Sequence, residues 1–405
     1  MFFTVIAHVT ALLTLAGLGY SALAIWSARL FLRRRSVPRG FAPDVSILKP
    51  LCGIDSGMYE AFVSNCHQQY GGSFEILFGV STPDDPSADL VLRLQTEYPE
   101  VAIRLIHCPQ NLGPNGKISV VAQLLPHARY DYLLINDSDI RVGPNYLAHV
   151  LAPFAPAAGP RPVGMVTALY RGLAYGTLGS RLEALGISTD FIPSVLTARF
   201  LERGLHFGMG STLGVSRAAL HAAFPDGLAP LAQYIADDYQ LGAHIDRAGF
   251  RIELCDEVVE TCVPAYRFRD FLDHQLRWLR TVRESRPAGY AGLVCANVLA
   301  WATLNLVASG ASLFALALFS MALLFRVCIA LGVGVGALND RQVLRDLWLL
   351  LPRDLVALAL WAWSYASDTV TWRGETFLLK NGKLIPETAA VRQAAVREEP
   401  VSGQR

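Results

Sequence analysis

The chain has 405 residues, of which 52% are hydrophobic, and a formal net charge of +1. A nearly neutral chain lacks the strongly basic surface that nucleic-acid binding requires, so we expect no nucleic-acid partner. The hydrophobic excess lies at the two ends of the chain, which is typical of a membrane protein.

The first predicted element is a membrane-spanning helix at residues 1–32. Residues 2–32 include no acidic residue and their first arginine is Arg29, so the run exceeds the roughly 20 residues that cross a bilayer core. A cleaved signal peptide fits less well, because no basic segment precedes this long run. Five arginines lie at or after its end, at positions 29, 33, 34, 35 and 39. This excess marks the cytoplasmic side, so the middle of the chain should face the cytoplasm.

Residues 43–265 predict one α/β domain. Short apolar runs typical of buried strands occur at 45–48, 74–80, 103–106 and 130–135, and helical patterns occur at 58–66, 87–97 and 118–125. Strands that alternate with helices indicate a doubly wound, mostly parallel sheet that binds ligands at the carboxyl ends of its strands. The sequence has neither GxGxxG nor GxxxxGK[ST], which argues against a dinucleotide dehydrogenase or a P-loop NTPase.

Three acidic pairs occur along this domain: Asp84 with Asp85, Asp137 with Asp139, and Asp237 with Asp238. The middle pair directly follows the apolar run at 130–135, so its carboxylates should lie where a strand ends at a cleft. Hard oxygen ligands in that place suit Mg²⁺ or Mn²⁺, which would neutralise a departing diphosphate. Judged alone, Asp137 and Asp139 fit a helix cap or the start of a turn equally well, and Asp237 with Asp238 could be a solvated pair.

Residues 266–290 predict an amphipathic segment in which arginines alternate with apolar residues. We expect it to lie on the anionic membrane surface, with its arginines toward the headgroups and Phe268, Phe271 and Leu272 in the acyl boundary. An ordinary solvated helix face is the alternative. Trp278, judged alone, is as well explained by a membrane-interface anchor as by a site residue.

Residues 291–338 carry one charge, Arg326, and predict two further membrane helices. Residues 352–372 are a further candidate, as a span or a re-entrant helix. The tail at 387–405 has no sustained apolar face and should be loose. We therefore expect a multi-pass membrane protein, and the excess of arginine over lysine, which is associated with GC-rich genomes, favours a bacterial inner membrane.

Six motifs occur in the order of a known family. They lie at residues 46–51 (SILKPL), 84–86 (DDP), 115–117 (NGK), 137–142 (DSDIRV), 236–239 (ADDY) and 277–278 (RW). In this order they resemble the ceramide glucosyltransferases and their bacterial relatives, which include the glycosyltransferases of hopanoid synthesis. The resemblance implies a membrane-bound enzyme with a nucleotide-sugar (GT-A) fold that uses UDP-sugars and inverts the anomeric centre.

The resemblance also implies residue roles. Asp238 matches the catalytic base, which takes the proton of the attacking hydroxyl. The residues expected to bind the nucleotide-sugar are Asp85, Lys117, Asp137, Asp139 and Arg277, with Asp137 and Asp139 as metal ligands. Those expected on the acceptor side are Asp237, Trp278 and Gly208. The family's last motif usually has Gln or Arg three residues before its Arg-Trp pair, where this chain has His274, so the acceptor stays open between ceramide and a hopanoid.

The implied function is transfer of a hexose, glucose or N-acetylglucosamine, from a UDP-sugar to the hydroxyl of a membrane lipid. A processive polysaccharide synthase would share this chemistry but would need more membrane helices to form a translocation channel. A non-catalytic membrane protein that binds nucleotide or lipid would be expected to lack at least one motif aspartate. All of them are present.

Overall fold

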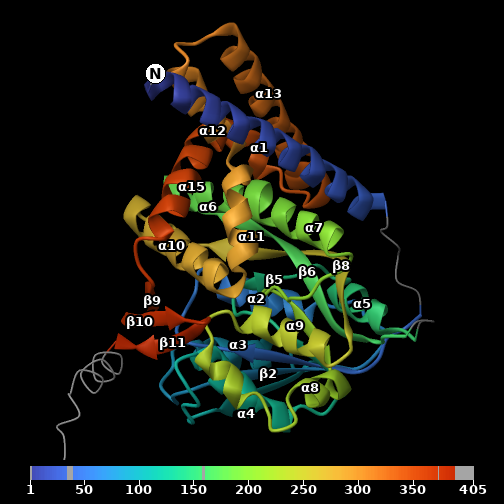
Figure 1. Cartoon of the computed structure of the whole chain (residues 1–405). Coiled ribbons are helices and arrows are strands. Elements are labelled where there is room, and N and C mark those ends of the chain that lie inside the picture. The colour runs from blue at the N-terminus through green and yellow to red at the C-terminus, as the bar shows by residue number, and fades with distance from the viewer. Residues whose placement is uncertain (1, 34–39, 157–159, 373, 388–405) are drawn as a thin grey trace, which may run out of the picture.

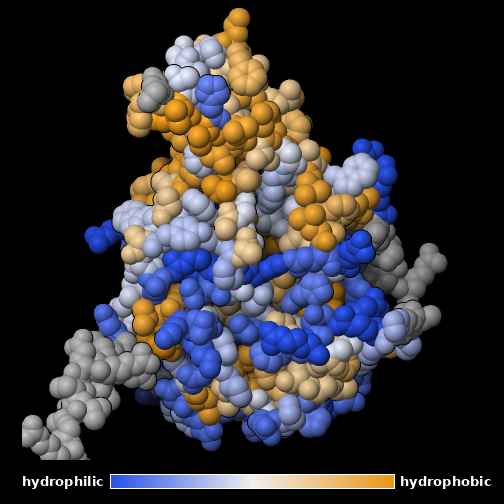
Figure 2. Space-filling view, viewed as in Figure 1, coloured by the Kyte–Doolittle hydropathy of each residue, from blue (hydrophilic) through white to orange (hydrophobic). Residues whose placement is uncertain are grey.

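The chain forms three layers: an α/β domain, a layer of helices beside it, and apolar helices on the far side of that layer (Figure 1). The computed structural model describes residues 2–33, 40–156, 160–372 and 374–387. Hydrophobic residues cover the end formed by α1 (Phe2–Arg33) and α13 (Leu313–Ile329), whereas hydrophilic residues cover most of the α/β domain (Figure 2). The polarity of the surface therefore follows the layers.

An eight-stranded sheet is the base of the α/β domain, in the order β3-β2-β1-β4-β7-β6-β8-β5. Its strands are β1 (Val45–Pro50), β2 (Phe74–Val80), β3 (Ala102–His107), β4 (Tyr132–Ile135), β5 (Ile140–Arg141), β6 (Val163–Ala174), β7 (Leu213–Ser216) and β8 (Arg251–Val263). Strands β3, β2, β1 and β4 are parallel, β7 is antiparallel to both of its neighbours, and β6 is parallel to β8. This mostly parallel sheet confirms the predicted fold class.

Helices cover the sheet as the sequence pattern predicts. They are α2 (Met58–Cys66), α3 (Ser87–Glu97), α4 (Gly116–Leu124), α5 (Tyr146–Leu151), α8 (Arg217–Ala223) and α9 (Asp237–Arg247), with short turns η1 (Leu125–His127), η2 (Ala152–Phe154) and η4 (Ala229–Gln233). The expected helices and strands between residues 45 and 135 are confirmed, because buried parallel strands read as continuous apolar runs. Every residue of β1 is buried.

The middle layer includes a helical segment that the sequence analysis assigns to the α/β domain. It consists of α6 (Leu178–Gly186), the π-helical turn η3 (Ile187–Phe191) and α7 (Ile192–Leu201). Helix α7 packs against α1 (Phe2–Arg33), and the Tyr20 hydroxyl lies 2.8 Å from the Ser194 hydroxyl. The same layer contains α10 (Phe268–Ser285), α11 (Pro287–Gly292) and η5 (Leu293–Ala296).

Among the described residues, two helices are long and apolar enough to cross a membrane, by length and composition: Phe2–Arg33 and Leu313–Ala337, the latter formed by α13 (Leu313–Ile329) and η6 (Ala330–Ala337). The pair Pro287–Ala296 and Val298–Ala308 is bent by 54° and is either one broken span or a re-entrant loop. Helix α12 (Val298–Ala308) has 11 residues, about 16 Å at 1.5 Å per residue, which is too short to cross alone. Of the two spans expected within 291–338, one corresponds to a helix long and apolar enough to cross and the other to part of this bent pair.

The C-terminal part also differs from the expectation. After α14 (Gln342–Asp346) and η7 (Leu347–Leu349), helix α15 (Leu350–Ser364) is followed by a small antiparallel sheet of β9 (Thr369–Trp372), β10 (Glu375–Lys380) and β11 (Lys383–Pro386). The candidate helix at 352–372 therefore stops at Ser364. Arg283 ends it, because its guanidinium donates to the Ser364 carbonyl and pairs with Asp368. The tail at 388–405 lies outside the described residues.

One face of helix α10 packs against neighbouring helices, with Phe271, Gln275, Leu276 and Arg283 buried. Phe271 is 0% exposed and lies in a cluster with residues of α6 and α12, whereas Phe268 is 45% exposed. Arg280 donates to the Thr369 carbonyl, and Arg283 is buried. The expectation that Phe271 reaches the acyl boundary is therefore wrong, because its helix face is covered by neighbouring helices.

Candidate active site

The site begins where β1 and β4 end side by side. The two strands are parallel and in register, so their carboxyl ends meet at one edge of the sheet. Lys49 is buried at the end of β1, and its Nζ donates to the Asp137 carbonyl oxygen at 3.0 Å. Burial lowers the pKa of Lys49 to about 8, against the opposing effect of Asp139 and Asp137. This contact fixes the acidic turn after β4.

Lys117 brings the second and third acidic pairs together. It lies in the first turn of α4, and its Nζ is 2.7 Å from Asp137 Oδ1 and 3.4 Å from Asp237 Oδ2. Burial favours the neutral lysine, but Asp137 and Asp237 outweigh it and raise the pKa of Lys117. The Asn115 side chain starts α4 by accepting from Ile118 N–H, and its amide donates to Asp237 Oδ1 at 3.1 Å.

Asp238 lies in the first turn of α9, and both of its carboxylate oxygens accept backbone N–H groups. Oδ2 accepts from Gly210 and Oδ1 from Tyr239, each at 2.7 Å. Burial raises the pKa of Asp238 to about 6, and the charge of Asp237 adds to this, while Lys117 and the two N–H groups oppose it. Such a carboxylate is ionised at neutral pH and is more basic than an ordinary aspartate.

Three of the predicted site residues converge on Gly210. A Cβ at this glycine would lie 3.3 Å from Asp238 Oδ2, 3.5 Å from Asp137 Oδ2 and 3.5 Å from Lys117 Nζ. The glycine therefore keeps open the space between two carboxylates and a lysine. A reacting group placed there would touch an acid–base residue and a cation at once.

Asp137 and Asp139 are the residues that the sequence predicts as ligands for a divalent cation. In the described ranges, no three His, Cys, Asp or Glu side chains are grouped closely enough to hold a metal ion. Asp139 accepts from the Thr261 hydroxyl, and burial, with the charge of Asp137, raises its pKa to about 6. Mg²⁺ is commonly held by one or two carboxylates, phosphate oxygens and water. A cation held by Asp137 and Asp139 would therefore need its remaining ligands from a bound diphosphate and water.

Asp85 lies at the same edge of the sheet and organises the loops there. Its two oxygens accept the Gly53 N–H at 3.1 and 3.0 Å, and Oδ1 also accepts from the Ser87 N–H at 2.9 Å. These bonds join the loop after β1 to the start of α3. Asp85, which the resemblance assigns to nucleotide-sugar binding, is thereby fixed between these two loops.

Gly208 and Asp237, which the resemblance assigns to the acceptor side, make different contacts. Gly208 has no room for a Cβ beside Met165 and Leu213, and its N–H donates to the Asp238 carbonyl at 3.4 Å. It supports Asp238 through the backbone. The Asp237 carboxylate is directed at Asn115 and Lys117, beside the predicted diphosphate.

A row of aromatic rings connects β6 and η3 to α10. Tyr170 lies 5.6 Å from Phe191, Phe191 5.7 Å from Trp278, and Trp278 5.6 Å from His274, between ring centroids. Burial raises the pKa of Tyr170 well above its usual value, and the negative charge of Asp238 is the next cause. Arg277 precedes Trp278 on α10.

Sequence reasoning missed Tyr170, Phe191 and Glu183. Glu183 is buried, and its Oε2 is 2.9 Å from His274 Nδ1 and 3.5 Å from Gln275 Nε2. The aromatic residues resemble ordinary core positions in apolar segments, and no spacing distinguishes them. In the sequence, only the unusual His274 indicated that α10 contacts a charged residue, which the structure identifies as Glu183.

Comparison with known proteins gives a consistent result. The family model described as glycosyl transferase family 21 matches residues 9–385. Ceramide glucosyltransferase 3 of Caenorhabditis elegans is 25% identical over 250 residues, which cover 59% of this chain and 50% of that protein. Ceramide glucosyltransferase of Candida albicans is 32% identical over 114 residues, 25% of this chain and 21% of that protein. The matches thus span half or less of these relatives' length.

Among solved structures, the mannosyltransferase PcManGT from Pyrobaculum calidifontis, in complex with GDP-Man and Mn²⁺, is similar to this chain. The TM-score is 0.55 at 18% sequence identity, and the match covers 89% of this chain and 98% of that one. At this identity the similarity concerns the fold alone.

Proposed function

Because the chain belongs to glycosyl transferase family 21 and has the GT-A fold, we propose that it transfers a hexose from a UDP-sugar to the hydroxyl of a membrane lipid, with inversion. The resemblance to ceramide glucosyltransferases is confirmed, and the chain is a nucleotide-sugar glycosyltransferase. The observation that carries the proposal is the convergence of Asp238, Asp137 and Lys117 on Gly210.

The donor is proposed to lie at the edge of the sheet where β1 and β4 end. Asp85 is assigned to the nucleoside side, and Lys117 and Arg277 to the diphosphate. Asp137 and Asp139 would hold Mg²⁺ or Mn²⁺, which when bound supplies positive charge to the diphosphate. The donor set of two carboxylates supports this assignment, and the similar mannosyltransferase was solved with Mn²⁺.

Asp238 is proposed to be the base. It takes the proton of the lipid hydroxyl while the oxygen forms a bond to the anomeric carbon, and the bond from that carbon to the diphosphate breaks with both electrons going to the leaving group. A single displacement of this kind inverts the anomeric centre. The N–H groups of Gly210 and Tyr239 fix the carboxylate, and each oxygen keeps a further lone pair for the proton.

The membrane arrangement is proposed as follows. Helix α1 and the helix Leu313–Ala337 cross the bilayer, with the bent pair as a third membrane element, and the domain at 43–265 faces the cytoplasm. The segment at 266–290 connects the domain to the membrane helices. Glucose and ceramide are favoured by the names of the relatives. His274 keeps a hopanoid hydroxyl as the alternative acceptor, and N-acetylglucosamine is the alternative sugar.

The test uses the full chain in vesicles that contain either ceramide or a hopanoid with a free hydroxyl. UDP-glucose and UDP-N-acetylglucosamine are supplied separately with Mn²⁺, and lipids are analysed by mass spectrometry. We expect a lipid that has gained one hexose, together with an equal amount of UDP. Release of UDP with a growing polymer would instead indicate a polysaccharide synthase, and no product from any pairing would contradict the proposal.

A further inference from the structure

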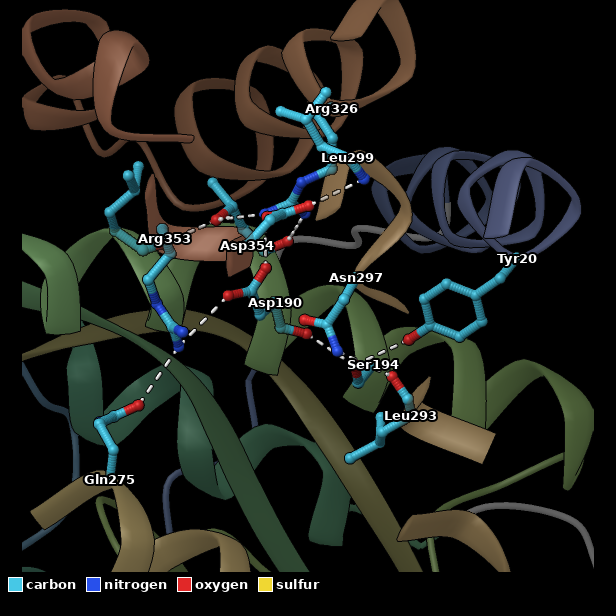
Figure 3. Close-up of polar contacts among 12 residues, drawn as sticks. Tyr20, Asp190, Ser194, Gln275, Leu293, Asn297, Leu299, Arg326, Arg353 and Asp354 are labelled. Carbon is cyan, nitrogen blue, oxygen red and sulfur yellow. Dashed lines mark hydrogen bonds and ion pairs between the residues drawn. The ribbon is translucent and has the colours of Figure 1, made fainter. Parts of the chain in front are cut away.

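Four charged side chains connect the membrane helices to the π-helical turn η3 (Figure 3). Arg326 of α13 lies 2.6 Å from Asp190 Oδ1 and 2.7 Å from Asp354 Oδ1. Arg353 of α15 lies 3.3 Å from Asp190 Oδ2 and also donates to Gln275 on α10 at 3.2 Å. Arg326 is 2% and Asp354 1% exposed, so these charges persist only because each has a partner.

Asp190 is therefore held from several sides. Its carboxylate pairs with arginines from two helices, and its carbonyl accepts the Ser194 hydroxyl, which also contacts Tyr20 of α1 (Figure 3). The preceding residue, Thr189, contributes its carbonyl to Arg326 at 2.8 Å. The backbone of η3 is thus fixed relative to the membrane helices.

The next residue along the turn, Phe191, faces the other way. Its ring lies against Tyr170 at 5.6 Å and Trp278 at 5.7 Å. Phe191 and Trp278 are half-buried, whereas Tyr170 is buried. Single π-helical turns inside helices are frequent at functional sites. Here two neighbouring residues connect the membrane helices to Trp278 of α10.

We propose that Phe191 and Trp278 form the wall against which the head region of the acceptor lipid packs, with the buried Tyr170 behind Phe191, and that the Asp190–Arg326 pair positions Phe191. The inference rests on the proposed function and adds acceptor-binding residues to it. Trp278 is the residue of α10 that the motif order assigns to the acceptor side, and the Phe191 ring lies 5.7 Å from it. Flat apolar rings suit the C–H faces of a lipid head, whose hydroxyl remains free for the base.

The first test replaces the ring. Phe191→Leu should raise the KM for the lipid acceptor about tenfold, as expected for loss of an aromatic contact and its buried area, while the KM for UDP-sugar stays within twofold. Phe200→Ala, at a 40% exposed phenylalanine on α7, is the matched control and should leave both unchanged. A rise in donor KM without a rise in acceptor KM would assign the ring to the sugar donor and overturn the proposal.

The second test asks whether Asp190 acts through Phe191. Asp190→Asn should raise acceptor KM in the same direction, and the double variant Phe191→Leu/Asp190→Asn should be no worse than Phe191→Leu alone. Ser194→Ala loosens the same turn more gently and keeps the test available if Asp190→Asn does not fold. Arg181→Met removes an ion pair between α6 and Asp346 and serves as the control with normal acceptor KM. Fully additive losses would overturn the positioning role.

The two proposals fail differently. If the wild-type protein forms no glycolipid from any donor and acceptor, the proposed function is wrong. If it forms glycolipid and Phe191→Leu has a normal acceptor KM, only the acceptor wall is wrong.

Discussion

Two clusters of charged side chains in this molecule differ in their balance. The site cluster contains the aspartates 137, 139, 237 and 238 and the lysines 49 and 117. The membrane-side cluster contains two aspartates, 190 and 354, and two arginines, 326 and 353. The first carries more acids than bases, whereas the second is formally neutral.

The difference in balance corresponds to a difference in role. A neutral cluster of buried, mutually paired charges needs nothing further and can hold helices together. A cluster with surplus carboxylates adds mutual repulsion to the cost of burial. Burial is the largest cause of the raised pKa values of Asp139 and Asp238, and the charge of the neighbouring aspartate, Asp137 or Asp237, is the second. The surplus therefore marks the cluster that is built to meet a ligand.

The strongest test of this comparison is Asp238→Asn. The amide keeps the size of the side chain but cannot accept the proton, and general-base catalysis contributes about 10² to 10⁴ in rate. We expect kcat to fall at least a hundredfold while UDP-sugar affinity, measured by titration, stays within a few-fold.

Asp89→Asn, at an exposed position in the first turn of α3, is the control and should keep full activity. If Asp238→Asn retained more than about a tenth of wild-type turnover, Asp238 would not be the base.

Removing one charge from the membrane-side cluster should lower the stability of the folded protein. Arg326→Met leaves Asp190 and Asp354 without their shared partner, and breaking a buried pair in this way costs about 3 to 5 kcal/mol. We expect a clearly lower Tm in detergent, with UDP-sugar affinity unchanged in the protein that stays folded.

The double variant Arg326→Met/Asp354→Leu restores the balance, because Asp190 keeps Arg353. It should recover part of the lost Tm. A double variant less stable than Arg326→Met would mean that charge balance is not what stabilises this cluster.

The helices and strands of the α/β domain can be predicted from the sequence more completely than the helices that pack against α1 and α10. From residue 45 to 135 the helices and strands are confirmed, because buried parallel strands and amphipathic helices leave different periodicities. Residues 178–201 and 350–364 are apolar and contain few charges, so their pattern fits a core helix, a span or an interfacial helix equally. Only packing against α1 and α10 decides between these.

The candidate site shows the same limit. The sequence indicated Asp137, Lys117 and Asp238 through motifs, and the structure brings them together around Gly210. It did not indicate Tyr170 or Phe191, because an aromatic residue in an apolar segment has no local feature that separates a site wall from a core. The roles of all these residues stay predictions until they are tested.

Asp137→Ala should weaken donor binding. It removes the closest partner of Lys117 and a proposed cation ligand, so the affinity for UDP-sugar should fall about tenfold and activation by Mn²⁺ should be blunted. Titration of UDP-sugar at several Mn²⁺ concentrations measures both.

Asp131→Ala, at an exposed aspartate just before β4, is the control. Unchanged metal dependence in Asp137→Ala would remove Asp137 from the cation site and assign the diphosphate to Lys117 and Arg277.

Surplus charge should also be visible in the pH dependence. The base must be ionised, and the pKa of Asp238 is raised to about 6, so kcat/KM should be constant above pH 7 and decrease as pH falls through 6. Below that point the decrease should approach tenfold per pH unit. A profile that is flat down to pH 5 would contradict the raised pKa or the role of Asp238.

The smallest predicted effect tests how much of that shift comes from the neighbouring charge. Burial is the largest cause of the raised pKa of Asp238, and the charge of Asp237 is the second. Asp237→Asn keeps an oxygen for the Asn115 amide, which lies 3.1 Å away, and Lys117 keeps Asp137 as its partner. With one negative charge removed, Asp238 should ionise more easily, so the acidic limb of kcat/KM should move to lower pH by a fraction of a unit. The direction in which the acidic limb moves decides the question. If the limb moved to higher pH, Asp237 would be stabilising the ionised form of Asp238, and its negative charge would not be adding to the rise in the pKa of Asp238.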